Sequence, residues 1–210
     1  MFSGSADGRL SAQSSPRALI AYVDQYIYVC VCDPNTPPGA LTSHPRPSNS
    51  NPRTSRMGTQ KGSILLTGAN GDIGSAIASE ILSTPDLASY YGLYAVRNIK
   101  TATQLSKVLQ RSPPDHRHDV VPLELSSLAS VRALAADINH RVASGSLPRI
   151  RVIIVNAGYF EWTEQHFTDD GMDMSFQANY LGHWLLILLL LKSMDEKEGR
   201  VVVVSSSMHE

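Results

Sequence analysis

A glycine-rich segment between an apolar run and a helix-forming stretch is the part of this sequence best suited to binding a phosphorylated ligand. The apolar run Ser63–Thr67 leads directly into the segment Thr67–Gly74, which reads TGANGDIG. Glycines in a strand–turn–helix let the backbone approach a pyrophosphate, and N–H groups at the helix start bind it. The spacing predicts a dinucleotide site, with a purely structural turn as the alternative. Its expected members are Thr67, Gly68, Asn70, Gly71, Asp72, Ile73 and Gly74.

Asp72 is the residue of this turn that suits a phosphate least. A carboxylate about 4 Å from a pyrophosphate would cost on the order of several kcal/mol in a partly screened site. Two arrangements remain open. Either Asp72 points outward as the acidic residue of the first helical turn, where the helix dipole favours it, or the cofactor binds weakly.

The glycine turn and five later segments follow the order of motifs of one enzyme family. The later segments are AVRN at Ala95–Asn98, LELSSL at Leu123–Leu128, VNAG at Val155–Gly158, FQANYLGH at Phe176–His183 and SSSMH at Ser205–His209. Together they resemble the short-chain dehydrogenase/reductase family over Lys61–His209, about the first two thirds of a family domain. The family turn is T-G-x-x-x-G-x-G. Here Gly68 and Gly74 match, Asp72 takes the middle position, and the spacing T-G-x-x-G-x-x-G is that of the extended branch.

The resemblance implies a nicotinamide cofactor and residues that contact it. The strand ending at Arg97 carries no carboxylate for a ribose hydroxyl, and the family's A-x-R-N ending makes Arg97 the partner of a 2′-phosphate. NADP(H) is therefore expected, with a solvated Arg97 as the alternative. Glu124 stands where the family has an adenine-contacting Asp, with a favourable charge at the helix N-terminus as the alternative explanation. The VNAG segment borders the nicotinamide ribose in the family. The implied contacts are Arg97, Asn98, Glu124, Leu125, Asn156, Ala157 and Gly158.

The implied reaction is hydride transfer between NADP(H) and a carbonyl or alcohol substrate, for which the family uses an Asn, a Ser, a Tyr and a Lys. Asn179 and Ser206 match the first two. No lysine of this chain has a tyrosine four residues before it. A missing general acid lowers rates by about 10²- to 10⁴-fold, so negligible turnover is expected of this chain alone. The alternative is a non-catalytic NADP(H)-binding sensor or interaction module.

Short apolar runs alternate with amphipathic stretches, which predicts parallel strands joined by helical crossovers. The expected fold is α/β, a doubly wound, Rossmann-like parallel sheet that is incomplete at the C-terminus, with Val201–Val204 as an exposed edge. The expected strands are Ser63–Thr67, Gly92–Val96, Val120–Leu123, Val152–Val155 and Val201–Ser205. The expected helices are Ile73–Ser83, Thr101–Gln110, Leu128–Ala143 and Met172–Lys192.

The first 60 residues differ in composition from the rest of the chain. The segment Asp33–Arg56 consists almost entirely of polar and turn-forming residues, which cannot bury enough apolar surface to offset chain entropy. Residues 1–60 are therefore expected to be a disordered or irregular extension, and residues 61–210 the dinucleotide-binding domain.

Composition narrows the class of partner. The formal net charge of -1 gives no field that would attract nucleic acid or an anionic membrane. The apolar run Trp184–Leu191 is shorter than the roughly 20 residues that span a bilayer, which predicts a buried helix and no membrane. Cys30 and Cys32 suit neither a disulfide nor a zinc site and indicate a reducing, cytoplasmic setting with no metal. The resemblance implies a possible homodimer through Met172–Lys192.

Overall fold

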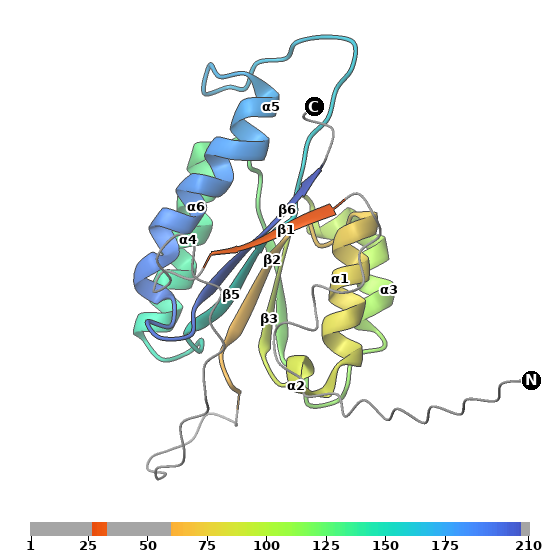
Figure 1. Cartoon of the computed structure of the whole chain (residues 1–210), viewed down its shortest axis with the longest axis vertical. Helices are drawn as coiled ribbons and strands as arrows, with labels where there is room; N and C mark the ends of the chain where they lie inside the picture. The colour runs from red at the N-terminus through yellow and green to blue at the C-terminus, as the bar shows by residue number, and fades with distance from the viewer. Residues whose placement is uncertain (1–26, 33–59, 207–210) are drawn as a thin grey trace, which may run out of the picture.

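The computed structural model describes residues 27–32 and 60–206, which form one six-stranded sheet with helices on both faces (Figure 1). The strand order is β1-β6-β5-β2-β3-β4. Strands β2 to β6 are parallel, so the predicted doubly wound, Rossmann-like α/β fold is confirmed. The strands are β1 Ile27–Cys32, β2 Ser63–Thr67, β3 Tyr91–Val96, β4 His118–Pro122, β5 Ile150–Val155 and β6 Arg200–Ser206.

The helices divide between the two faces of the sheet. In Figure 1, α1 and α3 cover one face, and α4, α5 and α6 cover the other. The helices are α1 Asp72–Ser83, α2 Pro85–Ala88, α3 Thr103–Leu109, α4 Leu128–Ala143, α5 Met174–Phe176 and α6 Gly182–Leu190. A π-helical turn, η3 Gln177–Leu181, joins α5 to α6, and the short 3-10 turns are η2 Ile99–Thr101 and η4 Leu191–Ser193.

Alternate side chains of the central strands enter two separate cores. Leu65 and Ile153 pack in the core that includes α4 and α6 side chains, whereas Leu66 and Ile154 pack in the core that includes α1 and α3 side chains. All five residues of β2 are buried. Because helices cover both faces of the sheet, these strands consist of unbroken apolar runs instead of alternating apolar and polar residues.

Strand β1 differs from the sequence-based expectation. It pairs antiparallel with β6, so that Ile27 lies opposite Ser206 and Cys32 opposite Val201. Residues 27–32 of the expected extension thus form a strand, and its other parts, 1–26 and 33–59, lie outside the described residues, so the division of the chain at residue 60 stays a prediction. The predicted exposed edge at Val201–Val204 is wrong. The backbone of β1 pairs with β6 and covers the edge that was expected to be exposed. Ile27, Val29 and Val31 of β1 are β-branched residues, which favour strands.

The helical run Met174–Ser193 has an apolar composition. Its 20 residues are long and apolar enough to cross a membrane. Length and composition alone are weak evidence for a membrane span, because the core helix of a soluble protein can have both. Its inner residues Ala178, Leu186 and Leu190 are buried in the core beside α4. This packing accounts for the apolar composition of the inner face.

His116 belongs to a buried aromatic cluster at the end of the sheet where β3 and β4 begin. Its Nδ1 lies 2.9 Å from the carbonyl oxygen of Ala88, and its Nε2 lies 3.2 Å from the Tyr94 hydroxyl. The ring of His118 stacks on it with centroids 5.4 Å apart. Burial lowers the pKa of His116, and the neighbouring His118 lowers it further, although the hydrogen bond to Ala88 opposes this. The folded state therefore favours the neutral ring.

This cluster predicts a loss of stability in mild acid. Since the folded pKa of His116 lies below its ordinary value of about 6.5, the unfolded chain binds the proton first as the pH falls through that value. The free energy of unfolding should thus be constant above about pH 7.5 and fall towards pH 5.5. Urea unfolding of the unsubstituted chain, His116→Gln and the exposed His166→Gln at both pH values checks this. The fall should shrink in His116→Gln and persist in His166→Gln, and an equal fall in all three would contradict the interpretation.

Candidate functional site

The predicted site residues gather at the edge of the sheet where the five parallel strands end. Thr67 closes β2, Arg97 follows β3, Glu124 follows β4, and Asn156 follows β5. Carboxyl ends of parallel strands are where open α/β sheets bind ligands. Ser206 ends β6 at the same edge, but its side chain lies outside the described part of the molecule.

Two of the three glycines in the turn are sterically required. Gly68 has a φ of +66°, and a Cβ there would lie 2.7 Å from the Cα of Ala157. A Cβ on Gly74 would lie 2.0 Å from the carbonyl oxygen of Gly68. At Gly71 the nearest atom would be 3.5 Å away, an ordinary contact. The turn therefore needs its first and last glycines for close backbone packing of β2, α1 and the end of β5.

The start of α1 suits a bound anion. Gly71 occupies the N-cap position and provides no side-chain hydrogen bond to the first turn of the helix. N–H groups that no side chain caps, together with the positive end of the helix dipole, favour a phosphate at this position. The twelve-residue helix α1 and the glycine turn thus fit the pyrophosphate of a dinucleotide.

Asp72 has the first of the two arrangements considered from the sequence. It lies in the first turn of α1 and is exposed, and its Oδ1 accepts a hydrogen bond of 3.2 Å from the Gln104 side chain at the start of α3. Asn70 also serves α3, because its Oδ1 accepts from the N–H groups of Gln104 and Leu105, both at 3.1 Å. Asn70 therefore caps a helix that has no side-chain cap at its own N-cap residue, Ala102.

Thr67 joins the turn to the end of β5. Its Oγ1 accepts from the N–H of Asn156 at 2.9 Å and from the N–H of Ala157 at 3.1 Å. In return, the Asn156 amide donates to the carbonyl oxygens of Thr67 at 3.0 Å and Gly68 at 3.3 Å. Asn156 Oδ1 is buried and has no protein partner among the described residues. These bonds fix the Asn156–Gly158 segment directly beside the glycine turn.

Arg97 and Glu124 form an ion pair between the ends of β3 and β4. Arg97 Nε lies 3.1 Å from Glu124 Oε2, and the Arg97 side chain is 71% exposed. Glu124 is itself held, because its Oε1 accepts from the N–H and hydroxyl of Ser126 at 3.1 and 2.8 Å. The pair orients the guanidinium at the edge of the sheet, while an exposed ion pair contributes at most about 1 kcal/mol to stability.

Two other predicted cofactor residues have structural roles. Asn98 caps the short turn Ile99–Thr101, because its Oδ1 accepts from the N–H of Lys100 at 2.9 Å. Leu125 has its side chain buried in the core. A Cβ on Gly182 would lie 2.7 Å from the Leu125 carbonyl oxygen, so α6 packs closely against this loop.

Asn179 is held by the loop that follows β5. Its Nδ2 donates to the carbonyl oxygen of Tyr159 at 2.7 Å, and its Oδ1 accepts from the N–H of Tyr159 at 2.6 Å. It lies within the π-helical turn Gln177–Leu181, a type of irregularity that is frequent at functional sites. Both ends of its amide are therefore engaged, and its main-chain carbonyl becomes the group that can serve other partners.

His183 is a further residue of this site, and none of the motifs in the sequence assigned it a role. Its Nε2 lies 3.0 Å from Thr67 Oγ1, and its ring is almost completely buried. One feature of the sequence could have indicated His183: it is a polar residue in an otherwise apolar helix, four positions after Asn179.

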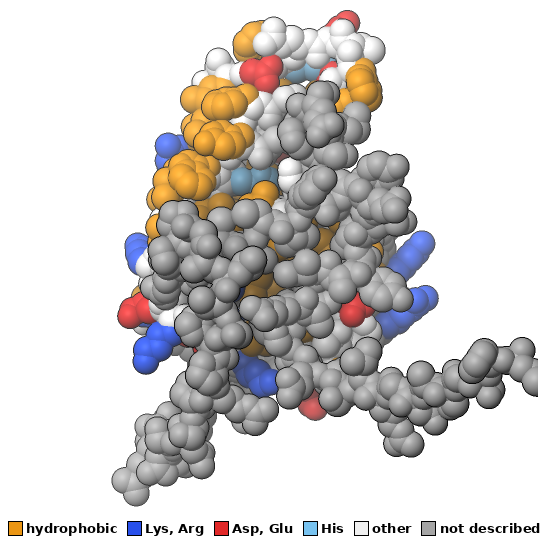
Figure 2. All heavy atoms as spheres, viewed as in Figure 1, with side chains coloured by type: hydrophobic (Ala, Val, Ile, Leu, Met, Phe, Trp, Pro, Cys, Tyr) orange, Lys and Arg blue, Asp and Glu red, His pale blue; other side chains and the backbone are white. Residues whose placement is uncertain are grey.

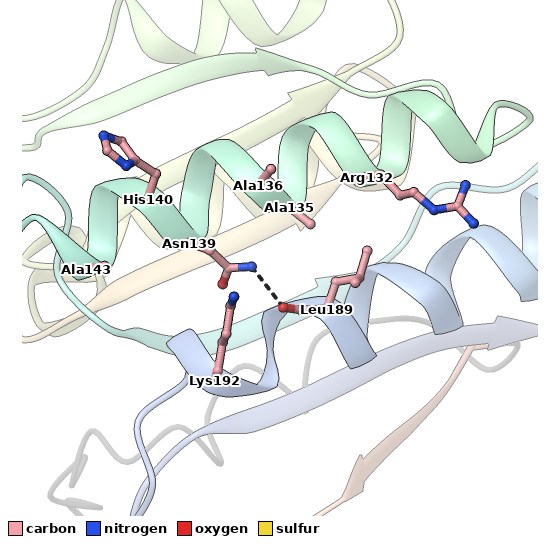
Figure 3. Close-up of a pocket in the computed structure, with 8 residues that line it drawn as sticks. All are labelled: Arg132, Ala135, Ala136, Asn139, His140, Ala143, Leu189 and Lys192. Atoms are coloured by element: carbon pink, nitrogen blue, oxygen red, sulfur yellow. Dashed lines mark hydrogen bonds between the residues drawn. The ribbon is translucent and has the colours of Figure 1, made fainter.

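A groove among the described residues lies away from this edge. It runs between α4 and the end of α6, where the Asn139 amide donates to the Leu189 carbonyl oxygen at 2.9 Å (Figure 3). It contains none of the predicted site residues. Its lining residues are Arg132, Ala135, Ala136, Asn139, His140, Ala143, Leu189 and Lys192. No three His, Cys, Asp or Glu side chains within residues 27–32 and 60–206 are grouped so as to hold a metal ion.

Comparison with known proteins agrees with the motifs and the topology. Residues 63–210 match the family model described as short chain dehydrogenase. The chain belongs to the short-chain dehydrogenase family. The short-chain dehydrogenase iccH of Talaromyces variabilis is 50% identical over 154 residues, which are 72% of this chain and 42% of that protein. Retinol dehydrogenase 14 of Mus musculus is 35% identical over 153 residues, 70% of this chain and 44% of that protein.

The solved structures add support for the fold. The NADPH-bound carbonyl reductase from chicken fatty liver has a TM-score of 0.50 and 24% identity, and the match covers 64% of this chain and 52% of that one. The likeness to this solved structure and the strand order of this chain therefore indicate the same fold. The chain spans less than half the length of the curated relatives it matches, 42% for iccH and 44% for the mouse enzyme.

Proposed function

We propose that this chain is the cofactor-binding part of an NADP(H)-dependent oxidoreductase that transfers hydride between NADP(H) and a small carbonyl or alcohol substrate. The observation that carries the cofactor assignment is the position of Arg97, at the end of β3 and within reach of the sheet edge that holds the glycine turn. In the described structure its ion pair runs through Nε, which leaves the two terminal amino groups for a phosphate.

Each group of residues has a part in this function. The uncapped start of α1 binds the pyrophosphate, and Arg97 binds the 2′-phosphate. Asn156, Ala157 and Gly158 border the nicotinamide ribose, while the Asn179 amide fixes the Tyr159 loop beside them. Ser206 at the end of β6 would hold the substrate oxygen. When bound, the cofactor supplies or accepts the hydride, and the whole protein must supply the proton.

The cofactor assignment predicts a selective loss of affinity. Arg97→Ala should weaken NADPH binding by about 10- to 100-fold, because it removes charge-assisted hydrogen bonds worth about 1.5–3 kcal/mol. NADH, which has no 2′-phosphate, should bind as it does to the unsubstituted chain. Fluorescence titration with both nucleotides measures this, and Lys100→Ala, a nearby exposed cation, is the control. Equal weakening of NADPH and NADH binding would argue against a 2′-phosphate contact.

A second candidate function is a non-catalytic NADP(H)-binding module that acts through contacts with other chains. The observation in its favour is an apolar stripe on the outer face of the α5–α6 helix, visible as an orange band in Figure 2. Its residues are Phe176, Tyr180, Trp184, Leu188 and Leu191, each about half exposed. NADPH binding without turnover of any carbonyl or alcohol by the full-length protein would favour this function over the oxidoreductase.

The same stripe supports a homodimer in either case. Large exposed apolar patches mark interaction surfaces, and burying this one against its copy would remove it from water. Trp184→Glu combined with Leu188→Lys should convert a dimer into a monomer, since both changes place charges inside the contact. Sedimentation velocity checks this, with Lys107→Glu on the opposite face of the sheet as the control. A monomeric unsubstituted chain would rule the dimer out.

A further inference from the structure

We propose that His183 is a positioning residue that connects the glycine turn to the helical turn carrying Asn179. This inference rests on the proposed function only in that the glycine turn is taken as the dinucleotide site. His183 does not reach the exposed edge where a cofactor or substrate would lie, because only 6% of its surface is exposed. Any effect on the reaction must therefore pass through its two hydrogen-bond partners.

Both ring nitrogens of His183 have partners on different parts of the site. Nε2 lies 3.0 Å from the Oγ1 of Thr67, at the end of β2. Nδ1 lies 3.3 Å from the main-chain carbonyl oxygen of Asn179, within the π-helical turn. The ring thus bridges the strand that leads into the glycine turn and the helix that carries the family's asparagine.

The partners fix the direction of these hydrogen bonds. A carbonyl oxygen only accepts, so Nδ1 carries the hydrogen and donates to Asn179. Burial lowers the pKa of His183 and favours the neutral ring, although the bond to Asn179 opposes this shift. In the neutral ring the second nitrogen is an acceptor, so the Thr67 hydroxyl donates to Nε2.

The result is a one-way chain of donors through Thr67. The N–H groups of Asn156 and Ala157 donate to Thr67 Oγ1, which donates to His183, which donates to Asn179. The alternative acceptor for the hydroxyl is the carbonyl oxygen of Ile154, which is farther away at 3.4 Å. Bonds in such a chain polarise one another, so His183 strengthens the contacts that hold Asn156 and Ala157 beside the turn.

Three substitutions separate the two bonds. His183→Gln can place an oxygen near the position of Nε2 and retain an acceptor for Thr67. His183→Asn is shorter and can retain only the contact with Asn179. His183→Leu removes both and keeps an apolar side chain of similar bulk in the core.

The first experiment measures the imidazole itself and needs no cofactor. The ¹⁵N chemical shifts of the His183 ring should show hydrogen on Nδ1 and none on Nε2. Hydrogen on Nε2 in the unsubstituted chain would overturn the proposal, whatever the cofactor measurements show.

The second experiment compares NADPH affinities of the three variants, each checked for folding by circular dichroism. His183→Asn and His183→Leu should bind NADPH about tenfold more weakly, and His183→Gln should bind within about threefold of the unsubstituted chain. Equal affinities in all folded variants, or a Gln variant as weak as Leu, would overturn the positioning role. If Leu does not fold, the comparison of Gln with Asn decides the matter.

The failure of the proposed function gives a different result. If the unsubstituted chain does not bind NADPH, the cofactor assignment is wrong. The tautomer and the thermal midpoints of the Gln and Asn variants then still decide the connection between Thr67 and Asn179, because each variant keeps only one of the two bonds. Hydrogen on Nδ1 with a midpoint lowered in both variants supports the connection, and a midpoint that either variant retains in full overturns it.

Discussion

Replacing Gly74 with alanine is expected to abolish dinucleotide binding and to lower the free energy of unfolding by about 3 kcal/mol or more. The added Cβ would lie 2.0 Å from the Gly68 carbonyl oxygen and 2.9 Å from the Ala69 Cα. Both are backbone atoms, so no side chain can move aside to relieve the contact. The helix start must shift away from β2, and with it the N–H groups that would bind the pyrophosphate.

Gly68→Ala should have an effect of similar size for a different reason. Its φ of +66° is unfavourable for a residue with a Cβ, and that atom would lie 2.7 Å from the Ala157 Cα. Gly71→Ala is the matched control, since Gly71 has an ordinary φ of -69° and a Cβ there would make only an ordinary contact, 3.5 Å from the Gly68 carbonyl oxygen. Urea unfolding and NADPH titration of the three variants measure the effects. If Gly74→Ala unfolds at the same urea concentration as Gly71→Ala, the steric account is wrong.

Thr67→Val should also cost about 3 kcal/mol or more of unfolding free energy, although valine has nearly the same shape as threonine. The change would leave the N–H groups of Asn156 and Ala157 and the Nε2 of His183 without their acceptor or donor. Each unsatisfied buried polar group costs about 1–3 kcal/mol. The loss should therefore exceed that of a single surface hydrogen bond several-fold.

Thr67→Ser provides the control for this prediction, because it keeps the hydroxyl and removes only a methyl group. Equilibrium unfolding in urea should rank the three chains as unsubstituted, Ser and Val, with Val far below the other two. Equal stability of the Ser and Val variants would mean that the Thr67 hydroxyl does not organise this end of the sheet.

The regular elements could be predicted closely because the patterns that indicate them, apolar runs for strands and amphipathic stretches for helices, lie within the elements themselves. The apolar run Ser63–Thr67 and the helix Leu128–Ala143 have the predicted bounds. Strand β1 could not be predicted in this way, because its pairing partner β6 lies at the other end of the described chain. The short helix Pro85–Ala88 and the π-helical turn Gln177–Leu181 were also missed, since neither interrupts the apolar pattern that the prediction used.

The sequence indicated which residues form the candidate site, but it did not indicate what each of them contacts. Asn70 and Asn98 turn out to cap short helical elements, and Asp72 contacts Gln104. Such roles depend on which segments lie side by side in space. His183 shows the same limit, since its partner Thr67 lies 116 positions away in the chain.

The pairing of β1 with β6 also sets the order in which the sheet can be completed. The first described strand is synthesised before all the strands that lie between the two in the sequence, whereas its partner is the last described strand. Until Arg200–Ser206 emerges, β1 has no native neighbour, and contacts over such long separations form slowly. During that interval an unpaired, β-branched segment is open to association with other chains. Strand β1 is therefore the described strand that waits longest for its partner during synthesis.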